Sequence, residues 1–166
     1  MIAPKEKGRI VKVIASLPAS VIYTQSFKIP LVGEEKMEES ANLNLQVISP
    51  IEATKAYMSW QKIGEAESEL ELLGAFVERK SVADIQKALD EANFYPVVFE
   101  FPALGIARLL KTLEGVSKER ALVFYVSPEG MDFLIVKNGE LYFDYFVSWK
   151  KIQKESPQMT KEMFEE

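Results

Sequence analysis

The stretch FYPVVFEFPALGIARLLKTLEG, residues 94–115, places a β-strand directly before an α-helix. Residues 95–101 are rich in β-branched and aromatic side chains, which favour a strand. Pro102 suits the first position of a helix and Gly115 suits the position just past its end. We therefore expect a helix over residues 103–114, and a strand that leads into a helix indicates the α/β class.

Two further strands are predicted upstream of this unit. Residues 9–18 form a short apolar run that ends at Pro18, as a strand entering a turn does. Residues 21–29 alternate, with apolar side chains at most odd positions and mainly polar ones at even positions, and Pro30 follows. This period of two predicts a half-buried strand that stops at Pro30.

The next segments predict helix, hairpin and helix in turn. Glutamates gather at the start of residues 34–48, where the helix dipole favours acids, and an apolar stripe follows at Met37, Ala41, Leu45 and Ile48. Residues 55–63 and 69–79 are two strand-like runs separated by a polar loop, which indicates a hairpin. Ser81 and Asp84 have the spacing of a capping box and predict the start of the following helix.

The C-terminal third predicts an antiparallel three-stranded sheet. Residues 121–126 and 131–136 are strand-like, and Asn138-Gly139 is a strong two-residue turn signal before the strand 141–149. Beyond these strands the sequence becomes polar, with a basic run from Lys150 to Lys154 that we interpret as a solvated helix or tail, and Ser156-Pro157 marks the start of another helix.

Composition narrows the classes of function. With 166 residues, of which 48% are hydrophobic, the chain has enough apolar surface to form a core. It has no stretch of about 18 apolar residues and no secretory h-region near Met1, so we expect a cytoplasmic protein without membrane insertion. The net charge of -5 argues against a nucleic-acid partner, which would require a basic surface.

The absence of two residue types limits catalysis further. The chain has no cysteine and no histidine, which excludes thiolate chemistry, Ser-His-Asp chemistry and His- or Cys-ligated zinc within it. Any catalysis would rest on carboxylates or lysines. Asp132, Glu140 and Asp144 lie on neighbouring predicted strands, and we interpret them as charges on solvated strand faces rather than as a glycosidase-like or metal site. We predict no catalytic residue, no metal and no cofactor.

Several phrases resemble the PilM-type actin-like family of type IV pilus assembly. The segment Pro18-Ala19-Ser20-Val21-Ile22 resembles the family's Pro-x-Ser-x-Val motif. The following segment, Phe27-Lys28-Ile29-Pro30, resembles the end of the family's next strand, which finishes with an apolar residue and Pro. The motif Gln46-Val47-Ile48-Ser49-Pro50-Ile51-Glu52 is similar to the family's helix end, and the segment Phe94 to Glu100 is similar to its Gly-x-x-Pro-x-x-Val-Asp region. The resemblance covers about residues 10–150.

This resemblance implies a fold class and a division of the chain. The fold expected from it is α/β (α+β), with actin-like (ribonuclease H-like) sublobes and mixed, largely antiparallel sheets. Residues 1–100 would form the first sublobe, with a mixed sheet and two helices, and residues 101–149 would begin the second. Residues 150–166 would form a polar tail that can be flexible.

This sequence departs from the nucleotide-binding pattern of the family in both phosphate loops. The family's first Asp-x-Gly phosphate loop would lie before residue 1. In its second loop, Asp-x-Gly-x-x-x-Thr, Tyr125 takes the place of the Asp and Ser127 that of the Gly, so the loop from Tyr125 to Asp132 is degenerate. Ser127-Pro128-Glu129-Gly130 suits an ordinary β-turn. ATP hydrolysis is not expected.

The resemblance implies a scaffold that binds the cytoplasmic tail of an inner-membrane pilus protein and lies peripheral to that membrane through its partner. Tyr57, Met58 and Trp60, on a strand expected near the domain edge, are the candidates for partner binding, unless they pack in the core. Phe146 and Trp149 carry the same two interpretations. Two different roles compete with this one: the cytoplasmic actin-like domain of a type II secretion inner-membrane protein, and an actin-like ATPase that lacks its first strand. Self-association through strand edges stays open.

Overall fold

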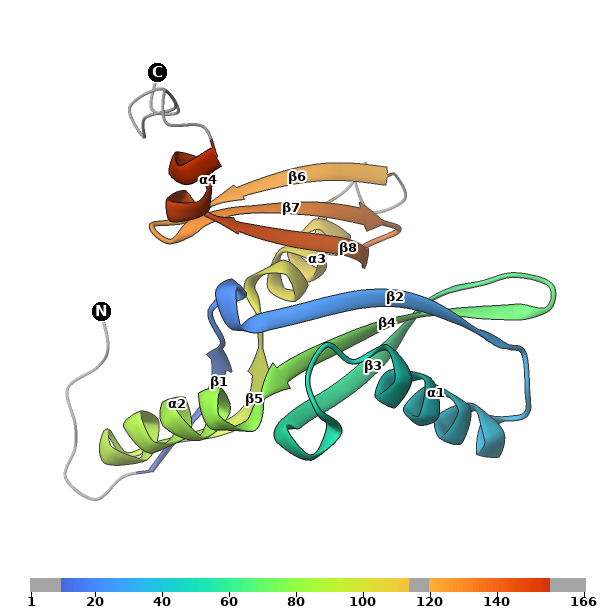
Figure 1. Cartoon of the computed structure of the whole chain (residues 1–166), viewed down its shortest axis with the longest axis horizontal. Coiled ribbons are helices and arrows are strands. Elements are labelled where there is room, and N and C mark those ends of the chain that lie inside the picture. Colours follow the sequence, from blue (N-terminus) through green and yellow to red (C-terminus); the bar gives the residue numbers. More distant parts are fainter. Residues whose placement is uncertain (1–9, 114–119, 156–166) are drawn as a thin grey trace.

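The structure is a computed structural model that describes residues 10–113 and 120–155. Its strands and helices follow one another in the order shown in Figure 1. In chain order the elements are β1 (Val11–Ser16), the 3₁₀ helix η1 (Ala19–Val21), β2 (Ile22–Pro30), α1 (Glu34–Ile48), the 3₁₀ helix η2 (Ala53–Lys55), β3 (Ala56–Glu65), β4 (Glu69–Glu78), α2 (Arg79–Glu91), β5 (Phe94–Glu100), α3 (Pro102–Thr112), β6 (Arg120–Val126), β7 (Gly130–Lys137), β8 (Glu140–Ser148) and α4 (Trp149–Glu155).

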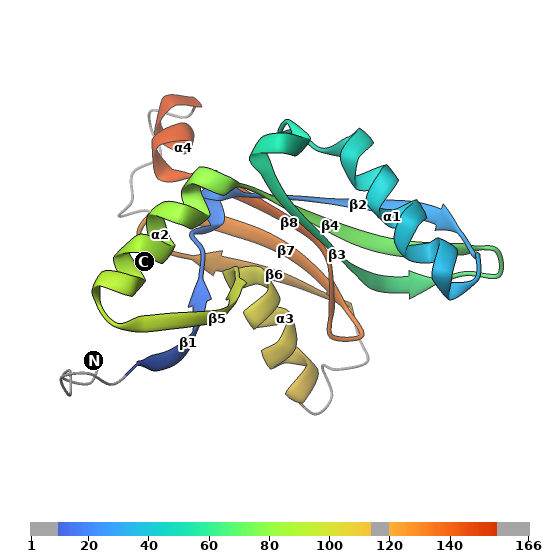
Figure 2. The same cartoon turned by 90° about the horizontal axis from the view of Figure 1, so that it is seen from below.

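These strands form three sheets. β1 pairs with β5 in parallel, whereas the sheets β2-β4-β3 and β6-β7-β8 are antiparallel throughout. Figure 2 shows β1 and β5 side by side with α2 alongside them. The predicted α/β class with mixed, largely antiparallel sheets is therefore confirmed.

The sheet β2-β4-β3 lies between α1 on one side and the sheet β6-β7-β8 with α3 on the other (Figure 1). On the α1 side, Ala41 of α1 is buried with Ile29 of β2 and Leu72 of β4. On the other side, a larger cluster joins β4 to β7, β8 and α3, and its buried members are Ile63, Leu73, Phe101, Ala103, Ala107, Leu134, Val136 and Leu141. Burial of both faces of β4 explains why this strand has a continuous apolar run from Leu72 to Val77.

β2 differs from its predicted pattern in one respect. Phe27 and Ile29 pack on the α1 side, as the alternation indicates. The even positions Ile22 and Thr24 were expected on the polar face, yet Ile22 packs in two hydrophobic clusters and Thr24 bonds to β8. The reason is that β8 lies against β2, so this part of the strand is covered on both sides.

Turn and cap predictions were confirmed in part. Asn138 and Gly139 both have positive φ, 54° and 73°, as the tight turn between β7 and β8 requires. Pro102 is at the start of α3, as predicted. The capping box at Ser81 is wrong, because β4 runs to Glu78 and α2 begins at once with Arg79. Gly115 and Ser156-Pro157 lie outside the described residues.

The basic run that follows β8 forms the short helix α4, whose lysines 150, 151 and 154 are exposed. This confirms a solvated helix for that run. In the described ranges, no helix has both the length and the apolar character needed to cross a bilayer.

Candidate functional site

A cavity of about 410 Å³ follows the edge of β3. β3 is an outer strand of its sheet, because β4 pairs with it on one side and no described strand pairs with it on the other. Residues 57–61, five consecutive positions of β3, all line the cavity. Such a cavity therefore exposes a strand edge as well as side chains.

The walls opposite β3 come from α2, β5 and α3, and further lining residues come from β4, from the start of β2 and from the segment between β1 and η1. They are mainly apolar and include Leu17, Ile22, Leu73, Val77, Val82, Phe99, Phe101 and Leu104. Polar side chains come from Ser59, Gln61, Gln86 and Glu100. An apolar slot with a few polar groups is typical of a site that binds a small molecule or a short peptide.

The three predicted partner-binding residues, Tyr57, Met58 and Trp60, all line this cavity. Successive side chains of a strand point to opposite faces, so Tyr57 lies on one face of the sheet and Met58 and Trp60 on the other. Trp60 also packs against the buried cluster under α1. Tyr57 is 47% exposed. Tyr57 thus belongs to the surface of the cavity, whereas Trp60 combines the two roles that the sequence left open.

Two arginines fix aromatic and acidic groups at the border of the cavity. The guanidinium of Arg79, the first residue of α2, lies 4.2 Å from the centroid of the Tyr57 ring. Arg108 of α3 forms an ion pair with Glu100 at the end of β5. The cation over the Tyr57 ring holds this side chain in place. The pairing with Arg108 balances the charge of the carboxylate that Glu100 contributes to the cavity wall.

Sequence reasoning missed the wall that faces β3. Phe99, Phe101 and Leu104 were predicted only as part of a strand and a helix, and Gln86 was not singled out. No motif links residues 99–104 to residues 57–61, because their proximity depends on how two separate sheets pack. The alternation of β5 could have marked Phe99 as inward-facing, but not the surface that it faces.

The segment predicted to be a degenerate phosphate loop lies between β6 and β7 and forms the predicted turn. The amide of Ser127 donates to the carbonyl oxygen of Gly130 at 2.9 Å, and the amides of Glu129 and Gly130 both donate to Ser127 Oγ at 3.3 Å. Trp149 Nε1 donates to the Ser127 carbonyl at 2.9 Å. The Ser127 hydroxyl oxygen accepts the amide hydrogens of Glu129 and Gly130, and the Gly130 carbonyl oxygen accepts that of Ser127, so these amides are already bonded within the turn rather than directed at a phosphate.

Asp132, at the end of the same loop, is 1% exposed. It pairs in register with Tyr125 of β6, and its Oδ1 has no hydrogen-bond partner among the described residues. Burial, with a smaller contribution from the charge of Asp144, raises the pKa of Asp132 to about 6. A buried carboxyl in this position favours its protonated form far more than a solvated one does.

The other two acidic residues on these strands have specific partners. Asp144 of β8 accepts a hydrogen bond from Thr24 of β2; burial raises the pKa of Asp144, and the bond from Thr24 opposes that rise. Glu140 pairs with Lys111 of α3 at 2.6 Å. The interpretation of Asp132 and Asp144 as charges on solvated faces is wrong, because β2 covers the face on which they lie. Across the described ranges, no group of three acidic side chains is placed to hold a metal.

Comparisons with known proteins give a match of structure alone. No protein-family model matches the chain, and no curated protein matches it in sequence. The PilM-PilN type IV pilus biogenesis complex contains a chain that superposes with a TM-score of 0.70 at 16% identity, over 90% of this chain and 48% of that one. The cytoplasmic domain of EpsL, an inner membrane component of the type II secretion system of Vibrio cholerae, superposes with a TM-score of 0.55 at 12% identity, over 90% of this chain and 57% of that one.

The chain therefore spans about half the length of the structures that it matches. At such low identity the likeness establishes the fold, and the predicted actin-like α/β architecture is confirmed. The sublobe boundaries at residues 100 and 149 stay a prediction.

Proposed function

We propose that this chain is a non-catalytic scaffold of a type IV pilus inner-membrane assembly platform, and that it binds the cytoplasmic tail of a membrane partner beside β3. The observation that carries the proposal is the apolar cavity that follows five consecutive residues of an outer strand. The likeness of the fold to a chain of the PilM-PilN complex supports the choice of assembly. The chain would then be cytoplasmic and peripheral to the membrane through its partner.

An extended peptide is the ligand that suits this geometry. A peptide that adds to a sheet edge gains main-chain hydrogen bonds from the strand, while its alternate side chains enter pockets beside it. Here the strand is β3, and the pocket side is formed by Phe99, Phe101 and Leu104. The tail should therefore have an apolar residue at every second position over the stretch that lies along β3.

A second candidate partner belongs to the type II secretion system. The similarity of this fold to the cytoplasmic domain of EpsL supports this second partner. The scaffold role is the same in both proposals, and the partner differs. Synthetic tails from the two kinds of membrane protein discriminate between them when they are titrated against the same chain.

We also propose that the chain does not turn over nucleotide. The amides of Glu129 and Gly130 are bonded to Ser127, and Tyr125 stands where the family has its phosphate-loop carboxylate. A ligand that binds the native state raises its melting temperature. We expect magnesium-ATP to leave the melting temperature unchanged, and a rise that depends on ATP concentration would contradict this part of the proposal.

The test of tail binding is calorimetric titration with the cytoplasmic tail peptide of the pilus membrane protein from the same organism. Saturable binding is expected to the chain and to a Tyr23→Ala control, which removes an exposed aromatic of β2 outside the cavity. Tyr57→Ala should weaken binding about tenfold, because an aromatic ring in a peptide groove contributes about 1.4 kcal/mol or more. Equal binding by both variants would place the tail elsewhere, and no binding of either kind of tail would reject the scaffold proposal.

A further inference from the structure

The outer face of the sheet β6-β7-β8, which lies away from α3, is apolar over three successive rows. Three sets of residues lie in register across the strands: Leu122, Ile135 and Phe143; Phe124, Phe133 and Tyr145; and Val126, Met131 and Val147. Side chains of one strand alternate between faces, so these nine residues share one face, while Leu134 and Val136 belong to the buried face. We call these nine residues the outer grid.

A solvated face of an antiparallel sheet is normally polar, because only the face toward the core needs apolar side chains. The outer grid breaks this rule. Leu122 is 63% exposed, and Phe124 and Val126 are each 56% exposed. Aromatic side chains alone cover roughly 150–250 Å² each when buried, so the open part of the grid amounts to on the order of 500 Å². A patch of this size on a monomer usually marks an interaction site.

A helix already packs at one end of the grid. α4 continues from β8, contacts β7 and β8, and rises from the side of the sheet opposite α3 (Figure 1). Met131, in the last row of the grid, is 8% exposed. Successive rows are two residues apart, about 7 Å, and a helix is about 10 Å wide, so one further helix beside α4 would cover the two open rows.

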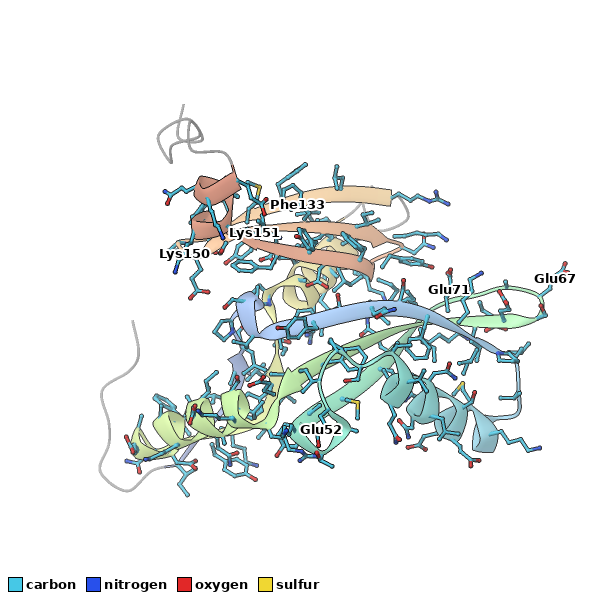
Figure 3. The ribbon with its side chains drawn as sticks, viewed as in Figure 1. Glu52, Glu67, Glu71, Phe133, Lys150 and Lys151 are labelled. Carbon is cyan, nitrogen blue, oxygen red and sulfur yellow. The ribbon has the colours of Figure 1, made fainter. Side chains whose placement is uncertain are left out.

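Basic side chains outnumber acidic ones around the grid. Arg120 precedes Leu122 on the same face of β6 and is exposed, and α4 contains three lysines against one glutamate. Lys151 of α4 donates to the hydroxyl of Tyr145 at 3.0 Å and lies 5.7 Å from the centroid of its ring. Figure 3 shows Phe133 on the sheet and Lys150 and Lys151 on the adjoining α4. The grid thus has a cation near each end.

We infer that the outer grid is a second docking surface, and that its occupant is an amphipathic helix of another polypeptide with an apolar stripe and acidic flanks. The charges select this occupant. A second copy of the chain would bring its own Arg120 and α4 lysines against the same basic groups, and like charges oppose association. A bilayer with anionic lipids would attract the lysines but repel a chain whose net charge is -5. The inference is independent of the tail site beside β3.

The probe is a synthetic peptide of about 14 residues, four helical turns, with leucines at helical spacing and glutamates elsewhere. One control peptide has the same composition in scrambled order, and another has lysine in place of every glutamate. Fluorescence anisotropy should show saturable binding of the glutamate peptide, with both controls weaker by about tenfold or more. Binding should also weaken with added salt, because exposed charges are screened.

Variants of the whole chain locate the binding. Phe124→Glu and, separately, Leu122→Glu should each lower affinity for the glutamate peptide by about tenfold or more, because each places a charge in the apolar contact. Both positions are more than half exposed, so the fold should tolerate them. Val47→Glu is the matched control, since Val47 is 84% exposed on α1, outside the grid, and should bind the peptide unchanged. All three variants should still bind the tail peptide.

Four results would overturn the inference. The first is no saturable binding of the glutamate peptide by the unaltered chain, and the second is equal binding of the lysine peptide. The third is a concentration-dependent dimer in sedimentation velocity that Phe124→Glu abolishes, which would assign the grid to a second copy. The fourth is binding to vesicles of phosphatidylserine and phosphatidylcholine that Phe124→Glu removes while peptide binding persists.

Discussion

The hydroxyl of Thr24 on β2 donates a hydrogen bond to the carboxylate of Asp144 on β8, across 120 residues of sequence. This bond joins the sheet β2-β4-β3 to the sheet β6-β7-β8 at the point where the two are packed. Burial raises the pKa of Asp144 and the bond from Thr24 lowers it. The hydroxyl therefore stabilises the charged carboxylate, and the two residues couple the packing of the sheets to pH.

Thr24→Val keeps the shape of the side chain and removes the donor. We expect a loss of about 1 to 3 kcal/mol in the free energy of unfolding at pH 7, where the Asp144 carboxylate would be left without this bond. Without the hydroxyl the pKa of Asp144 rises further, so the loss should shrink as the pH falls and the carboxyl becomes protonated. Urea unfolding at pH 7 and pH 5 measures both effects. Thr24→Ser, which retains a donor, is the control, and equal losses at the two pH values would contradict the coupling.

Asp132→Asn should stabilise the protein at neutral pH. The folded-state pKa of Asp132 is raised from 3.8 to about 6, so the folded state disfavours the charged form. The stability associated with this group is therefore complete below pH 3.8 and is lost as the pH rises through 6. The asparagine variant escapes this loss, and we expect a gain of about 2 to 3 kcal/mol at pH 7 and little change near pH 4.

The pH dependence of unfolding by urea, measured from pH 4 to pH 8, tests this prediction. The unaltered chain should lose stability relative to Asp132→Asn across pH 4 to 6, and the difference should level off above pH 7. Asp84→Asn, at an exposed aspartate of α2, serves as the control for removal of a carboxylate. A destabilised Asp132→Asn at pH 7 would show instead that the carboxylate has a partner that stabilises it.

Alanine substitutions at Tyr57 and at Trp60 should distinguish an effect on binding of the tail from an effect on the free energy of unfolding. Trp60 packs against the buried cluster under α1, so Trp60→Ala should lower the free energy of unfolding by about 2 to 4 kcal/mol. Tyr57 is about half exposed, and Tyr57→Ala should cost about 1 kcal/mol or less while weakening binding of the tail. Thermal unfolding and calorimetric titration of the two variants measure the difference. Similar stability losses in both would mean that Tyr57 is part of the core.

Gly74 allows β4 to pass close beneath α1. A Cβ at this position would lie 2.6 Å from Cδ2 of Leu45. Gly74→Ala should therefore destabilise the protein by about 1 to 3 kcal/mol through overpacking. The double variant with Leu45→Val should recover part of this loss, whereas Gly105→Ala, whose nearest atom lies at 3.8 Å, should be neutral or stabilising. Additive effects of Gly74→Ala and Leu45→Val in urea unfolding would exclude this contact as the cause.

Local sequence patterns accounted for the strands and helices with little error. The alternation in residues 21–29, the Asn138-Gly139 turn and the Pro102 helix start each depend on backbone preferences within a few residues, so they can be inferred without the rest of the chain. The capping box predicted at Ser81 is wrong because β4 continues to Glu78 and α2 begins directly after it, at Arg79. The sequence predicts three partner-binding residues on an expected edge strand, namely Tyr57, Met58 and Trp60. All three line the cavity.

The sequence by itself thus determined the elements, the α/β class, the absence of histidine and cysteine chemistry and one side of the candidate site. Only the tertiary structure decided what lies opposite: Phe99, Phe101 and Leu104 across from β3, and Thr24 across from Asp144. The physical reason is that a strand's two faces look alike in sequence when both are apolar. Which face is buried depends on the packing of separate sheets, and that packing buried Asp132 and left Leu122 and Phe124 exposed.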